Sequence, residues 1–165
     1  MVQDTVRVLG YLTLGSRLKR IGERLQAETQ VIFKLAGVGV ATSLMPTLRA
    51  LAQHGELTVG GLAEALGIAQ PGVTRNVAQL KAAGLVQQVK RRGDQRIRMI
   101  ALTRKGEELA DRSMRDLEPQ VLHAVAEICE GLSGPLLAQL DALEDALAAK
   151  PLHRRVHVSS PGGEA

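Results

Sequence analysis

Two short amphipathic segments joined at a glycine set the strongest constraint on the fold of this chain. Thr58 can cap the first segment, and Gly67 ends it after a run of apolar residues. The second segment opens at Gln70-Pro71, where a helix does not need the missing proline N–H, and it runs to Gly84. Its apolar positions share one helical face, at Val73, Val77 and Leu80. Two short helices joined by a glycine-containing turn are typical of a helix-turn-helix.

The residues after Gly84 change from a helical to an alternating pattern. We expect strands over 85–89 and 97–102, joined by a polar, basic tip at 90–96 with a turn at Gly93-Asp94. A β-hairpin that directly follows a helix-turn-helix is a wing. The predicted fold class is therefore mainly α with a small β-hairpin, a winged helix-turn-helix with additional helices at both ends.

Leucine-rich stripes with helical spacing occur near both ends of the chain. The stripes are Leu14, Leu18, Ile21 and Leu25 in a helix expected over 6–35, and Leu136, Leu140, Leu143 and Leu147 in the last helix. A lone helix of this length is marginal in water, so both stripes need cover. They can be buried within one chain or form a seam between two copies, and we favour the seam.

These segments predict one domain over residues 1–150. The winged helix-turn-helix lobe would occupy 42–103, and 6–40 with 104–150 would supply dimerisation helices. Residues 151–165 turn to Pro, Gly, Ser and His, which predicts a disordered tail.

Two helix boundaries depend on single residues. Thr42-Ser43 offers an N-cap for the first helix of the lobe. Pro119 lies inside the long helical pattern that Thr103 opens, so we expect a kink near 116–118 or two helices end to end.

Aromatic residues are almost absent, because Tyr11 and Phe33 are the only two and there is no tryptophan. Base-stacking recognition of single-stranded nucleic acid is therefore disfavoured. The apolar stretch at 31–45 is too short and too interrupted to span a membrane. Cys129 is the only cysteine, which excludes an intramolecular disulfide and a cysteine-based zinc site. We expect a buried structural thiol in a reducing, cytoplasmic compartment, and we see no basic secretory leader.

Positive charge is concentrated in one part of the chain. Residues 70–105 contain nine basic residues and the single acid Asp94, whereas the rest of the chain has 12 basic and 16 acidic residues. A basic block in an otherwise acidic protein is typical of a polyanion binder, although a solvated basic face without a partner is the alternative.

The assembled motifs resemble those of MarR-type transcriptional regulators. The resemblance is strongest over 57–109, beginning with LTVGGLAEALGIAQPGVTR at 57–75. It continues through Ala83-Gly84-Leu85-Val86, Asp94-Gln95-Arg96, Leu102-Thr103, Gly106 and the later turn Gly131-Leu132-Ser133. It implies a winged helix-turn-helix homodimer that binds pseudo-palindromic double-stranded DNA and mostly represses. Many such proteins release DNA when a small molecule enters a cleft between the dimerisation helices and the DNA-binding lobe, and others respond to oxidation or metal.

The second helix of the pair supplies the candidate base-reading residues. Side chains away from its buried stripe are Gln70, Gly72, Thr74, Arg75, Asn76, Gln79 and Lys81. The family's Ser/Thr-Arg pair matches Thr74-Arg75; arginine can bind guanine and glutamine or asparagine can bind adenine. The alternatives are a solvated charge or an internal ion pair for Arg75, and non-reading roles for Asn76 and Gln79.

The wing supplies the candidate phosphate or minor-groove contacts Arg91, Arg92 and Arg96. The family's wing acid and arginine match Asp94 and Arg96, whereas Gln95 departs from a frequent arginine. Asp94 can hold a neighbouring arginine, or it can be an ordinary turn residue beside Gly93.

Other functional classes find little support in the sequence. No nucleophile triad, phosphate loop or paired carboxylates appear at usable spacing, so we expect no enzyme activity and no cofactor. The four histidines show no convincing metal-ligand pattern, because His153 and His157 fall in the expected tail. A small-molecule effector would meet mainly aliphatic walls. A winged-helix protein-interaction module without specific DNA binding is the alternative function.

Overall fold

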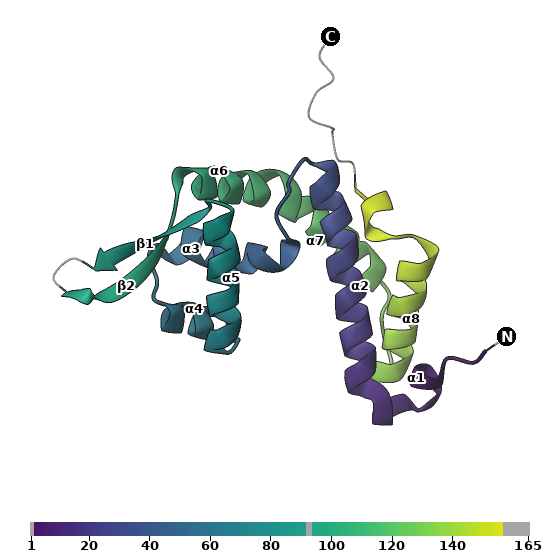
Figure 1. Ribbon diagram of the computed structural model, residues 1–165. Helices are drawn as coiled ribbons and strands as arrows, with labels where there is room; N and C mark the ends of the chain where they lie inside the picture. Colours follow the sequence, from purple (N-terminus) through teal and green to yellow (C-terminus); the bar gives the residue numbers. More distant parts are fainter. Residues whose placement is uncertain (1, 92–93, 157–165) are drawn as a thin grey trace, which may run out of the picture. The chain divides into compact units, whose positions relative to one another are not determined.

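The computed structural model describes residues 2–91 and 94–156, and for 91 and 94–97 it describes the backbone (Figure 1). The chain forms two compact units. The winged unit is Val40–Asp116, and the terminal unit combines the described residues of 1–39 and 117–165. The mainly helical architecture with one antiparallel hairpin confirms the predicted fold class.

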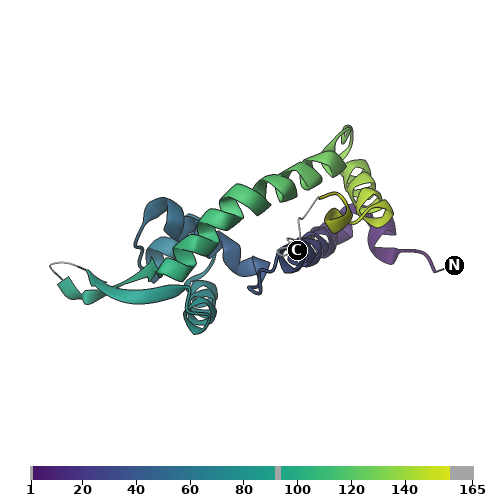
Figure 2. The same cartoon turned by 90° about the horizontal axis from the view of Figure 1, so that it is seen from above.

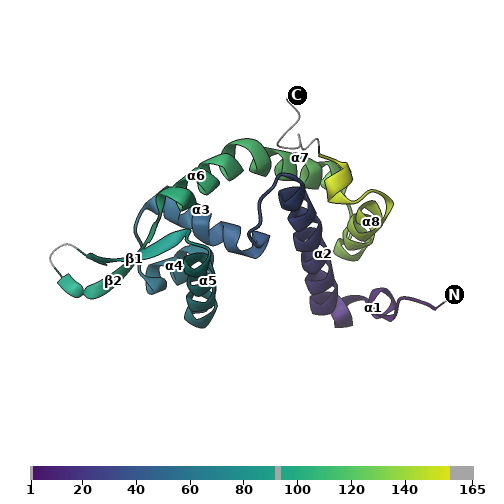
Figure 3. The ribbon, with the colours of Figure 1, turned by 45° about the horizontal axis from the view of Figure 1, so that its top comes forward.

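The winged unit follows the expected order of elements (Figure 3). Its elements are α3 Met45–His54, α4 Val59–Leu66, α5 Gln70–Ala82, β1 Val86–Arg91, β2 Asp94–Leu102 and α6 Arg104–Arg112. Thr58 caps α4 by accepting a hydrogen bond from the Gly61 N–H at 3.0 Å. Gly67 ends α4 in the left-handed region, with φ 63°. The helix-turn-helix therefore forms where these capping and glycine signals predict it.

The start of α3 differs from the expectation. A 3₁₀ turn, Thr42–Leu44, precedes this helix, and Leu44 occupies the N-cap position without a side-chain hydrogen bond. The predicted cap at Thr42-Ser43 is wrong because that dipeptide forms the preceding turn. Pro46 still lies in the first turn of α3, where its missing N–H leaves no helix bond unmade.

The wing is longer than predicted. We expected strands at 85–89 and 97–102, but β1 continues to Arg91 and β2 begins at Asp94. Figure 2 shows the hairpin from above. The pairing runs regularly from Val86 opposite Leu102 to Lys90 opposite Arg98, and the register shifts between Lys90 and Arg91. Apolar alternation underestimates such strands because ladder hydrogen bonds continue beyond the core.

One apolar cluster holds the winged unit together. Leu48 of α3, Leu62 of α4, and Val73 and Leu80 of α5 are fully buried in it. Val77 is half-buried against the same cluster, as its place in the predicted stripe requires. The polar face of α5 is thereby turned outward.

The N-terminus of α6 is fixed to the end of α5. The Thr103 hydroxyl donates to the Gly84 carbonyl at 2.7 Å and accepts from the Gly106 N–H at 3.1 Å. Lys105 Nζ donates to the Ala83 carbonyl at 3.1 Å. A Cβ at Gly106 would lie 2.0 Å from the backbone oxygen of Leu85, so only glycine permits this close approach.

The terminal unit is helical. Its elements are α1 Thr5–Val8, a 3₁₀ turn Gly10–Thr13, α2 Leu14–Leu35, α7 Glu118–Cys129, α8 Leu136–Ala149 and a 3₁₀ turn Leu152–Arg154. The single helix expected over 6–35 is wrong, because Gly10 has φ 57° and separates α1 from α2. A π-helical turn, Ser113–Leu117, joins α6 to α7, and Pro119 lies in the first turn of α7. The expected helix interruption before this proline is confirmed.

The start of the predicted tail is ordered. Leu152 is fully buried in a cluster with Ile32 and Leu147. The Arg155 guanidinium donates to Glu127 at 2.7 Å and to the Ala146 carbonyl at 2.9 Å. The expected disorder is therefore wrong for 151–156, because one leucine within the polar segment completes an apolar core. Residues 157–165, including His157, lie outside the described part of the chain.

Candidate nucleic-acid interface

The exposed side of α5 brings most of the predicted base-reading residues together. Val73 and Leu80 face the core, so the helix turns its polar positions outward. Gln70, Thr74, Arg75, Gln79 and Lys81 are exposed, and Gly72 and Asn76 are half-buried. This helix face is polar and carries two basic side chains, Arg75 and Lys81, and an α-helix is an element that the major groove of B-DNA admits.

The Arg75 guanidinium forms no ion pair with any carboxylate whose side chain the structure describes. The internal ion pair considered from the sequence is therefore absent from this part of the chain. An exposed, unneutralised arginine on a helix face can bind a guanine edge or a phosphate.

Thr74 and Asn76 have partners inside the winged unit. The Thr74 hydroxyl donates to the Gln70 carbonyl at 3.0 Å, so it must leave that carbonyl before it can donate to a phosphate. Asn76 Nδ2 donates to the hydroxyl of Thr47 at 3.3 Å, and Thr47 of α3 is fully buried. In this conformation Asn76 ties α5 to α3.

Gly72 and Gln70 lie where the two helices of the motif meet. A Cβ at Gly72 would meet Ile68 Cδ1 at 3.7 Å, an ordinary contact, so packing within the chain does not require glycine there. The Gln70 amide nitrogen would lie 3.7 Å from a Cβ at Gly60 of α4. The Gln70 side chain therefore leans over the start of α4.

The predicted wing residues are described only in part. Arg91 and Asp94 are backbone partners at the end of the hairpin, and Arg96 lies in β2. Their side chains, and all of Arg92, lie outside the described part of the structure. The phosphate contacts of the three arginines and both alternatives for Asp94 stay predictions.

Sequence reasoning left Lys90 and Arg98 out of the candidate interface. Both side chains are exposed on the wing, opposite each other in the register. The signal that could have found them is the period of two from the buried Val86 and Ile100. The first predicted strand ended one residue before Lys90, whereas Arg98 lay inside the second predicted strand and was given no role there.

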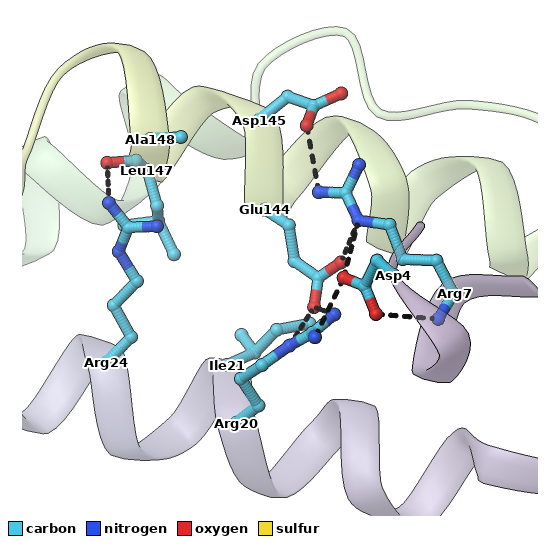
Figure 4. A pocket seen from close by; sticks show the side chains of 9 residues that line it. All are labelled: Asp4, Arg7, Arg20, Ile21, Arg24, Glu144, Asp145, Leu147 and Ala148. Atoms are coloured by element: carbon cyan, nitrogen blue, oxygen red, sulfur yellow. Dashed lines mark hydrogen bonds and ion pairs between the residues drawn. The ribbon is translucent and has the colours of Figure 1, made fainter. Parts of the chain in front are cut away.

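A buried charge network in the terminal unit was also missed (Figure 4). Arg17 is 1% exposed and donates to Asp141 at 2.7 Å and to Glu144 at 3.0 Å. Arg20 and Arg7 also donate to Glu144, at 2.6 and 2.8 Å. Through Arg7, Arg17 and Arg20 the network joins α1, α2 and α8.

The network controls the protonation of Glu144. Burial alone raises the pKa of a carboxyl, but hydrogen bonds and charges from Arg20 and Arg17 outweigh it and hold the pKa of Glu144 below its ordinary value. Glu144 is therefore a charged structural residue at neutral pH.

Cys129 is exposed, so the expected buried thiol is wrong. Ala124 and Ile128 take the buried face of α7, and Cys129 follows Ile128 by one residue, about 100° around the helix. Within residues 2–91 and 94–156, no three His, Cys, Asp or Glu side chains gather as a metal site would require. None of the helices in that same part is both long and apolar enough to cross a membrane.

A family model described as the MarR family matches residues 38–97. This match covers α3, the helix-turn-helix and most of the wing. The matched segment is therefore the part of the chain that carries the candidate interface.

Three solved structures are similar over more than four fifths of the chain. A cysteine-to-serine mutant of MarR from E. coli, complexed with operator DNA, has a TM-score of 0.63 at 16% identity and covers 88% of this chain and 99% of its own. BpsR from Bordetella bronchiseptica, whose DNA binding is regulated by 6-hydroxynicotinic acid, has a TM-score of 0.60 at 22% identity, covering 82% and 91%. The transcriptional regulator PA4135 has a TM-score of 0.56 at 26% identity, covering 82% and 96%.

Proposed function

Because residues 38–97 match the MarR family model, we propose that this chain is a homodimeric, sequence-specific DNA-binding transcriptional regulator of that family. Its α5 would enter the major groove, and its wing would contact phosphates or the adjacent minor groove. Repression of pseudo-palindromic operators is the mode of action that we propose. The family consists of regulators rather than enzymes.

The observation that carries this proposal is the outward face of α5. It combines the unneutralised Arg75 with exposed Gln70 and Gln79 in the most basic part of the chain. These side chains have the donors that recognise guanine and adenine edges. The alternative, a protein-interaction module, predicts a neutral face at this position.

Exposed apolar residues in the terminal unit support a homodimer. Leu18 of the first leucine stripe is 52% exposed and Leu136 of the second is 45% exposed, although Ile21, Leu140 and Leu147 are buried within the chain. Tyr11 and Leu12 are also exposed, at 64% and 82%. A second copy would cover these side chains, and one chain leaves both stripes incomplete.

We also propose that a small molecule controls DNA release. The support is the structural neighbour BpsR, whose DNA binding is regulated by 6-hydroxynicotinic acid. The chemistry of this chain's own effector is left open by that likeness, because the shared feature is the fold.

Selection of bound sites from random duplex DNA tests the function. We expect a pseudo-palindrome with half-sites centred about 10 base pairs apart, since one recognition helix would enter each of two successive major grooves. Arg75→Gln should weaken binding by about 1–3 kcal/mol and relax preference at one position of each half-site. Lys19→Gln, which removes an exposed charge from α2, is the matched control. Enrichment of no sequence at modest ionic strength would refute specific DNA binding.

A further inference from the structure

Two basic side chains lie directly opposite each other on the wing. The register pairs Lys90 of β1 with Arg98 of β2, in the last regular pair before the shift at Arg91. Directly opposed residues of antiparallel strands point to the same face, with Cβ atoms about 4.5–5.5 Å apart. Both side chains are exposed. The hairpin therefore presents a double positive charge at one point of one face.

The strand alternation identifies that face. Lys90 follows Val86 by four residues and Arg98 precedes Ile100 by two, so all four side chains share one side of the hairpin. Val86 and Ile100 are buried in the cluster that includes the apolar stripe of α5. The pair therefore continues the α5-facing side of the wing, about 7 Å beyond the last core residue of β2.

This arrangement is unfavourable in the isolated chain. Like charges directly opposite each other destabilise a strand pair. Neither residue forms an ion pair with a carboxylate whose side chain the structure describes. By contrast, Arg104 donates to Glu108 at 3.0 Å and Lys105 donates to the Ala83 carbonyl, so nearby basic residues of α6 are already engaged.

We propose that Lys90 and Arg98 together bind one phosphodiester of duplex DNA, beside the groove that α5 enters. This inference rests on the proposed function and assigns a phosphate site to two residues outside the predicted interface. An anion between the two cations replaces their repulsion by two charge-assisted contacts. The pair thus weakens the free wing and strengthens the complex.

The test compares the double variant Lys90→Gln/Arg98→Gln with the wild-type dimer. Each dimer carries two wings, so the variant loses about two phosphate contacts and the slope of log Kd against log salt falls by about 1.8. Between 50 and 200 mM salt, the wild-type loss of affinity should then exceed the variant's by about 12-fold. Fluorescence anisotropy on a duplex selected by the wild type measures both slopes.

The control Lys19→Gln/Lys34→Gln removes the same charge from exposed positions of α2 and should keep the wild-type slope.

A urea titration without DNA gives the second readout. The wing variant should unfold at the same or a higher urea concentration than the wild type, because the repulsion is gone. Single variants at Lys90 and Arg98 should fall between the wild type and the double variant in slope.

Three results would overturn this assignment. A wing variant with the slope and affinity of the α2 control shows that the pair binds no phosphate. A lower urea midpoint accompanied by weaker binding shows a structural role instead. Failure of the wild type to bind any duplex contradicts the proposed function itself, and this outcome is distinguishable from the other two because it precedes any comparison of variants.

Discussion

Glu144→Gln tests whether the buried charge network holds the terminal unit together. The substitution nearly keeps the shape of the side chain and removes its charge. In the wild type the carboxylate accepts hydrogen bonds from Arg7 at 2.8 Å, Arg17 at 3.0 Å and Arg20 at 2.6 Å. Arg7 and Arg17 donate to one carboxylate oxygen and Arg20 to the other, so the single acceptor oxygen of the amide cannot serve all three. The substitution also removes the negative charge that the buried Arg17 pairs with.

The expected loss follows from how deeply each partner lies. Breaking a buried ion pair destabilises by about 3–5 kcal/mol, and the Arg17 side chain is 1% exposed. Arg17 keeps its ion pair with Asp141 at 2.7 Å, so the free energy lost at Arg17 should lie at the low end of that range. The Arg7 and Arg20 side chains are 31% and 41% exposed, so each adds only about 0–1 kcal/mol. We expect a total near 3 kcal/mol, equivalent to a fall in Tm of about 6–12 °C.

The same residue predicts a pH dependence. The folded chain holds the pKa of Glu144 below the unfolded value of about 4.3. Its contribution is therefore fully present above that unfolded value and is lost as pH falls through the lower folded pKa. The difference in stability between wild type and Glu144→Gln should be constant from pH 7 to 5 and should shrink below pH 4.

Thermal unfolding followed by circular dichroism at several pH values measures both effects. Asp145→Asn is the matched control, because Asp145 is 67% exposed and pairs with the same Arg7 at 2.8 Å. Asp145→Asn should destabilise the protein by no more than about 1 kcal/mol, so its fall in Tm should be much smaller than that of Glu144→Gln. Equal Tm values for the two variants would refute the claim that burial of Arg17 makes this network strong.

Three further substitutions test individual contacts. Gly106→Ala places a Cβ 2.0 Å from the Leu85 carbonyl oxygen and should destabilise by about 3 kcal/mol in urea unfolding, whereas Gly22→Ala, with no atom within 4 Å, should be neutral or stabilising. Leu152→Ala should destabilise by about 2–5 kcal/mol; a wild-type unfolding curve would mean that 151–156 does not pack as described. Asn76→Ala leaves the buried Thr47 hydroxyl without its donor and should destabilise the protein by about 1–3 kcal/mol. The DNA sequence that the variant selects should be unchanged. A changed base preference would mean that Asn76 reads a base.

The sequence predicted the winged unit well because its boundaries are encoded locally. Thr58, Gly67 and Pro71 each act within one or two helical turns, and the period of Val73, Val77 and Leu80 gives the orientation of α5 directly. Capping, left-handed glycine and a helical period are properties of neighbouring residues. The exposed face of α5 could therefore be predicted residue by residue.

The terminal unit was harder to predict because its partners are distant in sequence. Arg17 seemed to belong to a solvated face, since its carboxylate partners Asp141 and Glu144 lie more than 120 residues away. Leu152 is similar, because its polar neighbours resemble a tail and its core lies on other helices. Asn76 could not be assigned from α5 alone, because its partner Thr47 belongs to another helix.

The joint between α5 and α6 restricts how DNA recognition can be adjusted. Thr103, Lys105 and the close approach at Gly106 fasten the last residues of α5 to the first turn of α6. The two helices must reorient together, since tilting one alone would break these hydrogen bonds or open the backbone contact. If α5 reads DNA as proposed, substitutions on α6 that contact no nucleotide should alter DNA affinity through the angle of α5, without changing which bases are read.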